Sequence, residues 1–284
     1  MIAFAKRNIR LFFRDKSAVF FSLLAVFIII GLYALFLGDV WTENFSDIAN
    51  ARQIMDAWIM GGLVAVTSVT ATMGAFGVLV DDRTKKIEKD FAASPVKKAS
   101  LAGGYILSAF TVGVVMSVVA LVLAQGYMLL GGGAMLSAAA YLKLLGLIIL
   151  TTLANTAMVF FLVSFFRSQN AFSTASTVIG TLIGFVTGIY LPIGTLPAAV
   201  QWVVKCFPVS QAVGLFRQVM MADQLAIGFA GAPVQAVAEF RQMLGVDYVF
   251  GGHTVTALEA VLILLATAAV FYALSVWRMR QKKR

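Results

Sequence analysis

The sequence predicts an all-α integral membrane protein with six transmembrane helices, and three observations support this prediction. Its 284 residues are 61% hydrophobic before the 24 glycines are counted, only 12% are charged, and the mean hydropathy is +0.92. Soluble proteins contain about 45–50% apolar residues with glycine included, so the bilayer must solvate most of this chain. Charged residues also leave uncharged windows that are long enough to cross about 30 Å of hydrocarbon.

Each span is bounded by charges, glycines or prolines. The glycine run 131–133 ends the third span, and Pro192 ends the fifth because proline cannot continue a helix. The predicted spans cover about 18–38, 58–80, 104–130, 144–166, 172–191 and 255–277.

Lysine and arginine are distributed unevenly between the two sides of the predicted bundle. The N-terminal tail, the second connection, Arg167 and the C-terminal tail hold 17 of them, and the other connections hold five. Loops rich in lysine and arginine stay in the cytoplasm, so both termini are expected there. The net charge of +9 therefore indicates topology, and no nucleic-acid partner is expected.

Two segments outside the spans have their own patterns. Residues 2–16 place apolar and basic side chains on opposite faces of a helix, which favours a helix in the cytoplasmic interface over an unstructured basic flank. Residues 192–253 form an outer connection that is too apolar for a free loop. We expect broken helices there that fold back into the outer membrane face.

The sequence argues against an enzyme. It contains no Gly-Lys dipeptide and therefore no P-loop for ATP. The single histidine, His253, lies six residues from Glu259, a spacing that does not share a helix face. The single cysteine, Cys206, has no intrachain disulfide partner, and a metal site of His and Cys is hard to build. The roles of these three residues stay open.

The fifth predicted span carries small residues at a strict four-residue spacing. Such a stripe lets another helix approach closely, within the chain or across a dimer, although chance glycines in a membrane helix give the same pattern. The stripe consists of Ser176, Gly180, Gly184 and Gly188.

The cytoplasmic segment 81–98 is dense in charges of both signs. Within it, Ile87 and Phe91 lie four residues apart and share one face of a helix. Such a helix is suited to docking a soluble partner, and a solvated loop is the alternative. Pro95 disfavours helix at Ser94 and therefore ends the segment.

Three stretches of the sequence resemble the membrane subunit of ABC-2 type transporters. Residues 7–16 are similar to the family's basic connecting helix, and 196–217 to its re-entrant outer region. Residues 86–96 (KIEKDFAASPV) are similar to its G-T-L-E-x-L-x-x-S-P-V segment, which bears the coupling helix. This stretch has Lys85 and Lys86 where Gly and Thr are usual, and one more residue between Glu88 and Ser94.

The resemblance implies partners. It implies two cytoplasmic ABC ATPase subunits that carry ATP and Mg, no cofactor on this chain, and a second permease chain, identical or similar. The coupling helix that would contact the ATPase consists of Lys86, Ile87, Glu88, Lys89, Asp90, Phe91, Ser94 and Pro95. The implied location is a bacterial or archaeal inner membrane.

The resemblance also implies a substrate pathway at the interface between the two permease chains. Its candidate lining residues are Thr67, Ser68, Thr70, Thr72 and Met73 on the second span, and Thr177, Thr181, Phe185 and Thr187 on the fifth. These residues are uncharged, which fits a hydrophobic or amphipathic substrate, and the small outer region suggests the drug- and antibiotic-export branch. The alternatives are a nucleotide-independent channel or scaffold and, with less support, a polytopic membrane enzyme.

Overall fold

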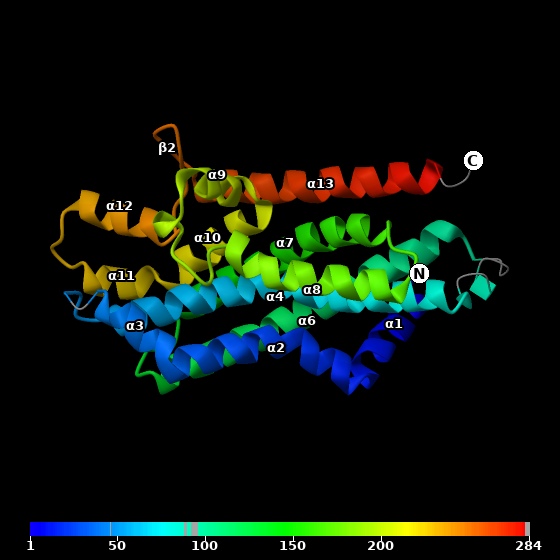
Figure 1. The fold of residues 1–284 in the computed structure, drawn as a ribbon, viewed down its shortest axis with the longest axis horizontal. Helices are drawn as coiled ribbons and strands as arrows, with labels where there is room; N and C mark the ends of the chain where they lie inside the picture. Colours follow the sequence, from blue (N-terminus) through cyan, green and yellow to red (C-terminus); the bar gives the residue numbers. More distant parts are fainter. Residues whose placement is uncertain (46, 88–89, 92–95, 282–284) are drawn as a thin grey trace.

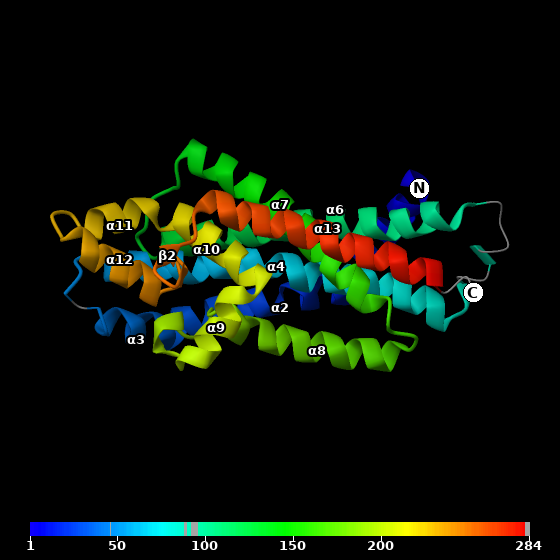
Figure 2. The same ribbon diagram turned by 90° about the horizontal axis from the view of Figure 1, so that it is seen from above.

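The computed structural model describes residues 1–45, 47–87, 90–91 and 96–281. Most of these residues are helical, and the long helices run along one axis of an elongated bundle (Figures 1 and 2). The elements are α1 (Ile2–Arg14), α2 (Lys16–Leu32), a π-helix (Tyr33–Leu37), α3 (Gly38–Glu43), α4 (Ala51–Thr84), α6 (Lys98–Leu130), α7 (Ala138–Val163), α8 (Gln169–Val186), a 3-10 helix (Ile193–Thr195), α9 (Ala198–Cys206), α10 (Pro208–Met220), α11 (Ala222–Gly228), α12 (Val234–Met243), β1 (Val249–Phe250), β2 (His253–Thr254) and α13 (Ala257–Gln281).

The two ends of the bundle differ in content. One end, here called the basic end, holds α1, the C-terminus of α4 and the C-terminus of α13 (Figures 1 and 2). The opposite end, here called the loop end, holds the short helices α9, α11 and α12 and the β1–β2 hairpin (Figure 1). The long helices connect the two ends.

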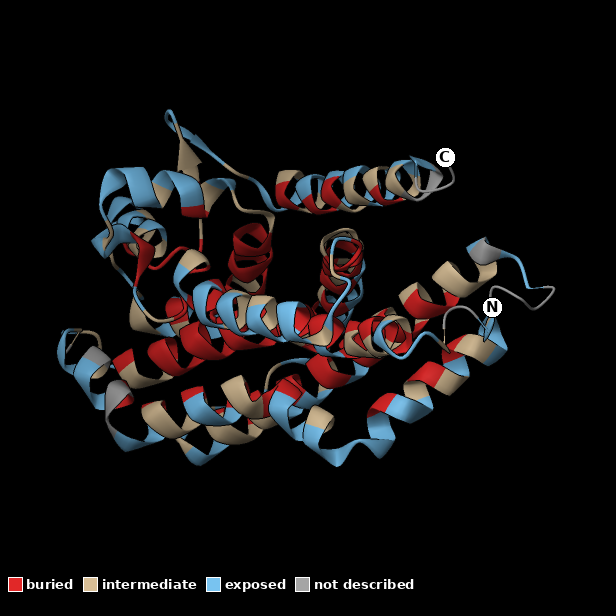
Figure 3. Cartoon of the chain, turned by 45° about the vertical axis from the view of Figure 1, so that its right-hand side comes forward, coloured by how far each residue is buried: buried red, intermediate tan, exposed pale blue. Residues whose placement is uncertain are grey.

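Helix α4 forms the core of the bundle. Of its most apolar stretch, 78% is buried inside the chain, against 28% for α2 and for α13 (Figure 3). Its 34 residues span about 50 Å, and α6, α7, α8 and α10 pack around it. A helix that is apolar on every side needs such neighbours, whereas α2 and α13 leave their apolar side chains exposed for lipid.

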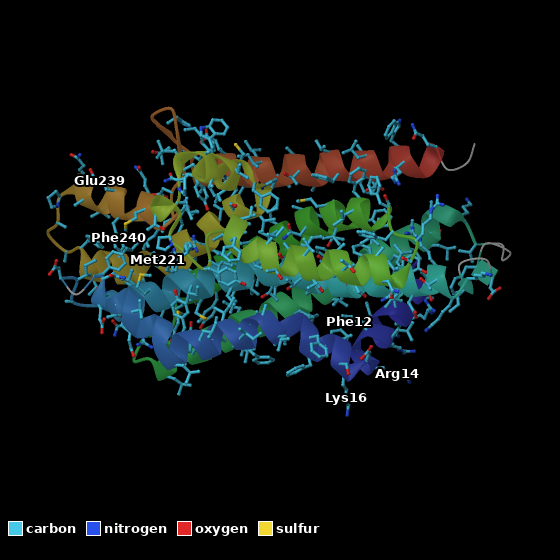
Figure 4. The ribbon with its side chains drawn as sticks, viewed as in Figure 1. Phe12, Arg14, Lys16, Met221, Glu239 and Phe240 are labelled. Carbon is cyan, nitrogen blue, oxygen red and sulfur yellow. The ribbon has the colours of Figure 1, made fainter. Side chains whose placement is uncertain are left out.

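The first two helices meet at a sharp corner. Asp15 ends α1 and also begins α2, because its carboxylate accepts a hydrogen bond from the backbone N–H of Ala18 at 3.0 Å. Phe12 on α1 turns inward and is 2% exposed, while Arg14 and Lys16 project outward at the corner (Figure 4). Helix α1 thus has the two faces that the sequence predicts for residues 2–16.

The apolar helices agree with an all-α membrane protein, as the sequence predicts. Five of them are long and apolar enough to cross a bilayer: α2, α4, α6, α7 and α13. The pair α9–α10 adds a sixth candidate if it counts as one span, but it bends by 85°. Helix α8 also runs along the bundle (Figure 1), although its serines, threonines and N-terminal amides keep it out of the apolar set.

The end of α8 differs from the predicted span 172–191. The helix stops at Val186, because Gly188 adopts φ +65° and turns the chain toward α9. The following outer connection is broken into short helices, as expected for residues 192–253, and ends in the β1–β2 hairpin, while its position at the outer membrane face stays a prediction. Its aromatic side chains are packed, with Phe240 against Phe229 and Phe45, and Met221 is fully buried (Figure 4).

Candidate functional site

A buried carboxylate ties three helices together at the basic end. Asp82, near the end of α4, is 1% exposed and accepts two hydrogen bonds from Arg7 of α1, at 2.6 and 2.9 Å. The hydroxyl of Tyr105 on α6 donates a third, at 2.6 Å. The hydrogen bond to Asp82 raises the pKa of the Arg7 guanidinium. A buried charge is tolerated when it is paired and hydrogen-bonded in this way.

Aromatic rings connect this carboxylate to the cytoplasmic segment. The Phe4 ring of α1 makes edge contacts with Phe91 and Tyr105, with ring centroids 5.0 and 4.9 Å apart. The Arg7 guanidinium lies over the rings of Phe4 and Phe91 at 5.5 and 5.3 Å. We call Phe4, Arg7, Asp82, Phe91 and Tyr105 the α1–α4–α6 junction.

The junction includes Phe91, one of the two apolar residues predicted to anchor a partner. The sequence predicts this ring as an anchor for a soluble partner, but the structure packs it against helix α1 of its own chain. Asp90 beside it is exposed and Ile87 is half-buried. Lys86 adopts φ +63°, so the chain leaves the axis of α4 at this residue. The predicted coupling residues Glu88, Lys89, Ser94 and Pro95 lie outside the described residues.

A second arginine attaches α4 to α7 at the same end. Arg83 donates from Nη1 to the carbonyl oxygens of Val163 and Phe166, at 3.1 and 3.3 Å. The last carbonyls of a helix have no partner within the helix, and a cation there also complements the helix dipole. The end of α4 therefore holds the end of α7 as well as α1 and α6.

The candidate pathway residues of the second span are mostly enclosed. Thr67, Ser68, Thr72 and Met73 on α4 are 0–3% exposed, because α6, α7, α8 and α10 cover this helix. Ser68 also accepts a buried hydrogen bond from Asn155 of α7 at 2.7 Å. These four residues therefore pack the inside of the chain and do not line a surface that a second chain can reach.

Helix α4 reaches the bundle surface along a short strip. Thr70 is half-buried and Gly74 is exposed, with Phe12 of α1 3.7 Å from the Cβ position of Gly74. Gly77 continues the strip, and a Cβ atom at this position would lie 3.5 Å from the ring of Phe172 on α8. The sequence indicates only Thr70 here. The signal for the glycines was their spacing from Thr70, which places all three on one helix face.

The predicted pathway residues of the fifth span, three on α8 and Thr187 directly after it, also divide into exposed and buried positions. Thr177, Thr181 and Phe185 are exposed, whereas Thr187 is fully buried and donates to the carbonyl of Ile183 at 2.6 Å. The exposed hydroxyl groups of α8 and the Thr70 strip of α4 thus lie on two helices that pack against each other. The structure does not bring all nine predicted residues to one surface.

The small-residue stripe of α8 has three different environments. The Cβ position of Gly184 collides with the ring of Tyr190, and that of Gly188 lies 2.6 Å from Ile193. No atom of the chain lies within 4 Å of the Cβ position of Gly180, and the Ser176 hydroxyl donates a hydrogen bond to the carbonyl of Phe172. The loop-end half of the stripe therefore fits the turn that follows α8.

At the loop end, a buried cation holds four segments. Arg217 of α10 is 0% exposed and donates to Gly188 O at 2.8 Å, Leu244 O at 3.0 Å and Trp58 O at 3.3 Å. Its guanidinium lies 4.5 Å from the centre of the Trp58 ring, and the indole N–H donates to the same Leu244 carbonyl at 2.7 Å. The sequence indicates this arginine as a charge in the outer connection and as the last residue of the stretch 196–217 that resembles the re-entrant region, but not its buried contacts.

The pair His253 and Glu259 meets despite its spacing. The two residues do not share a helix face, but His253 lies on the hairpin before α13, so its Nε2 reaches the Glu259 carboxylate at 3.0 Å. Glu259 also accepts from the backbone N–H of Thr256 at 2.7 Å, and Thr256 Oγ1 accepts from the Glu259 N–H. This is a helix cap. Among the described residues, no group of three or more metal-binding side chains occurs.

Comparison with known proteins places these features in a family. The family model described as ABC-2 family transporter protein matches residues 41–277, which run from the end of α3 through α13. No curated protein matches the sequence. The match covers most of the chain, including α4, α8 and the Arg217 cluster. The chain therefore belongs to the ABC-2 family of transporter proteins, as a membrane transport subunit and not an ATPase.

Proposed function

We propose that this chain is the permease of an ATP-driven exporter and works with two copies of a separate cytoplasmic ATPase and a second permease chain. Membership of the family supports a permease that has an ATPase partner. The observation that carries the finer proposal is the α1–α4–α6 junction, because it links the cytoplasmic segment to the central helix. In this proposal the basic end faces the cytoplasm, in line with its excess of lysine and arginine.

The junction supplies a route from the ATPase to the pathway. A force on the segment around Asp90 reaches Phe91, whose ring bears on Phe4 and Arg7. Arg7 holds the buried carboxylate of Asp82, so movement of α1 moves the end of α4. Because α4 is one continuous helix of 34 residues, a shift at Asp82 is carried as far as Trp58 at the loop end.

The pathway residues that reach the surface of the chain favour a hydrophobic or amphipathic substrate. The exposed Thr177 and Thr181 of α8 and the half-buried Thr70 of α4 offer hydroxyl groups, and the exposed Phe185 offers an apolar face. A charged substrate would lose hydration here with no charged side chain to replace it. A drug, an antibiotic or a lipid-like molecule meets these conditions. Helix α8, with its row of serines and threonines, is the helix best suited to line a path between two copies of the chain.

The test is to purify the tagged chain from its native membranes in mild detergent and identify what is bound. We expect a P-loop ATPase in stoichiometric amount, whose ATP turnover rises with amphipathic compounds. Asp90→Arg should reduce the amount of bound ATPase about fivefold, because an exposed charge at a docking surface contributes about 1 kcal/mol.

The matched control is Glu239→Arg, the same charge reversal at an exposed position of the loop end. It should leave the bound ATPase unchanged. A wild-type chain that is free of ATPase in every detergent would contradict the proposed function and favour a nucleotide-independent channel or scaffold. Equal amounts of ATPase on wild type and Asp90→Arg would contradict only the docking position.

A further inference from the structure

A cleft lies at the loop end, on helices other than those assigned to the pathway. It has a volume of about 590 Å³ and is bounded by the first half of α7, the N-terminus of α13 and the corner between α10 and α11. Sites for small ligands commonly enclose about 300–1,000 Å³. None of its lining residues belongs to α4 or α8. It is therefore separate from the proposed substrate path.

The cleft exists because small residues stand where large ones would close it. Ala140 and Gly146 of α7 and Ala257 of α13 line the opening, and the Cβ position of Gly146 has no atom within 4 Å. Leu215 of α10, which is 4% exposed, and Leu150 of α7 form apolar walls. From Lys143 to Leu150 the slot extends about 10 Å along α7.

Two charges of opposite sign remain available at the cleft. Lys143 of α7 and Asp223 of α11 both line it and are exposed, and no ion pair joins either residue to another among the described residues. The other polar side chains of the lining are engaged. Gln218 donates to Asp247 at 3.0 Å, and Ser137 accepts from the Ala140 N–H at 3.2 Å.

The surroundings of the cleft are suited to lipid. Leu142 and Ile149 on α7 are 73% and 53% exposed, and Leu258 on α13 is 68% exposed. Leu142 and Leu258 belong to the first two turns of apolar helices, where hydrocarbon gives way to headgroups, and Ile149 lies about two turns further along α7. A ligand at this depth meets apolar walls below and the charges of Lys143 and Asp223 at the rim.

We propose that the cleft binds one phospholipid with a zwitterionic headgroup. The lipid phosphate faces the Lys143 ammonium, the headgroup ammonium faces the Asp223 carboxylate, and an acyl chain lies against Leu150 and Leu215. An anionic headgroup satisfies Lys143 but meets the negative charge of Asp223. An uncharged lipid leaves both side chains without partners. Only a ligand with both charges and an apolar chain matches the whole cleft.

Lipid bound here would support the loop end. Leu215 lies two residues before Arg217 on α10, and the same cleft contacts α11 and α13. Filling the slot adds to the apolar contacts that α10 and α13 already make with α7. Binding should therefore raise the thermal stability of the chain, and this effect needs neither ATP nor the transported substrate.

The first experiment tests the headgroup. The full chain is delipidated in detergent and titrated with palmitoyl-oleoyl phosphatidylethanolamine or phosphatidylglycerol, and retained lipid is counted by native mass spectrometry alongside the melting temperature. We expect wild type to prefer phosphatidylethanolamine about two- to fivefold. Asp223→Asn should reverse this preference, because Lys143 then acts alone. Lys143→Gln should weaken retention of both lipids.

The second experiment tests the slot itself with a matched pair. Gly146→Leu fills the cleft and should reduce retained phosphatidylethanolamine by about tenfold or more. Gly126→Leu places the same side chain in open space on α6 and should retain lipid as wild type does. Both variants should melt at or above the wild-type temperature without lipid, because leucine favours helix over glycine.

Two results would overturn the proposal. One is equal retention of both lipids by wild type with no change in Asp223→Asn. The other is retention of phosphatidylethanolamine by Gly146→Leu at the wild-type level. Either result leaves the proposed transport function untouched, because ATPase binding is measured separately.

Discussion

Each end of the bundle has an arginine that connects several helices, but the partners and the burial of the two arginines differ. At the basic end, Arg7 pairs with a carboxylate and its side chain is 32% exposed. At the loop end, Arg217 is fully buried. Among the described residues, its guanidinium donates hydrogen bonds only to carbonyl oxygens and lies over the Trp58 ring. An ion pair next to water can open and reform. A cation enclosed by fixed carbonyls stays in place.

This difference suggests which end moves. Carbonyls of α4, the turn after α8 and the segment after α12 all converge on Arg217, so these segments keep one arrangement at the loop end. The junction at the basic end joins α1, α4 and α6 through side chains alone. Side chains tolerate small shifts between helices better than a set of backbone contacts does. We therefore expect the helices of the basic end to shift relative to one another before those of the loop end when a partner subunit moves.

The largest effect is expected from removing the Arg217 guanidinium. Arg217→Met should lower the free energy of unfolding by about 3–5 kcal/mol, because several buried carbonyls lose their donor together. Arg217→Lys should recover only part of this loss, since an ammonium group lacks the planar fork that reaches separated acceptors. Melting curves in detergent measure both. A lysine variant as stable as wild type would show that the loop end needs only a charge.

A smaller and asymmetric effect is expected at the basic end. Arg7→Ala leaves the buried Asp82 carboxylate without its ion pair and should cost about 3 kcal/mol. Asp82→Ala leaves an arginine that can reach water and should cost about 1 kcal/mol. The double variant should be less destabilised than the sum, with a coupling energy of about 1–3 kcal/mol.

The control for this cycle lies on the same helix. Arg10 is exposed on α1, and Arg10→Ala should change stability by less than about 0.5 kcal/mol. Equal costs for Arg7→Ala and Asp82→Ala would contradict the asymmetry. Additive costs in the double variant would show that the pair is not coupled.

The smallest effect tests how far the tight packing of the loop end extends along α8. Gly184→Leu should destabilise the chain by about 1–3 kcal/mol, because the new side chain meets the Tyr190 ring. Gly180→Leu, one turn toward the basic end, should be neutral or stabilising by up to about 1 kcal/mol. If Gly180→Leu instead prevents self-association while the melting temperature holds, this half of the stripe belongs to an interface between two copies.

The sequence predicts the long helices well because the bilayer fixes their length. Uncharged windows in the sequence correspond to α2, α4, α6 and α7, the last predicted span with its single charge Glu259 corresponds to α13, and the glycines after Leu130 end α6 as expected. Their exact ends were less predictable. Helix α4 begins at Ala51, seven residues before the predicted span, because its first turns are covered by α11 and need no lipid.

The candidate site was harder to predict because its contacts join distant residues. Arg7 and Asp82 are 75 positions apart, and Trp58 and Arg217 are 159 apart, so no local pattern indicates that they meet. The enclosed threonines of α4 show the same limit. Hydroxyl side chains look alike in sequence whether they face a pathway or bond back to their own helix. For Thr67 and Thr72 the structure shows the second case.

The lone thiol of Cys206 allows the unmodified sequence to be labelled at one site. It is the single cysteine in the sequence, and it is exposed at the end of α9, away from the α1–α4–α6 junction. A membrane-impermeant maleimide therefore labels one known position without any cysteine having to be removed first. Labelling of intact cells reads out on which side of the membrane the loop end lies. In an assembly of two chains, a pair of spin labels at this position gives one distance that can be followed through the ATP cycle.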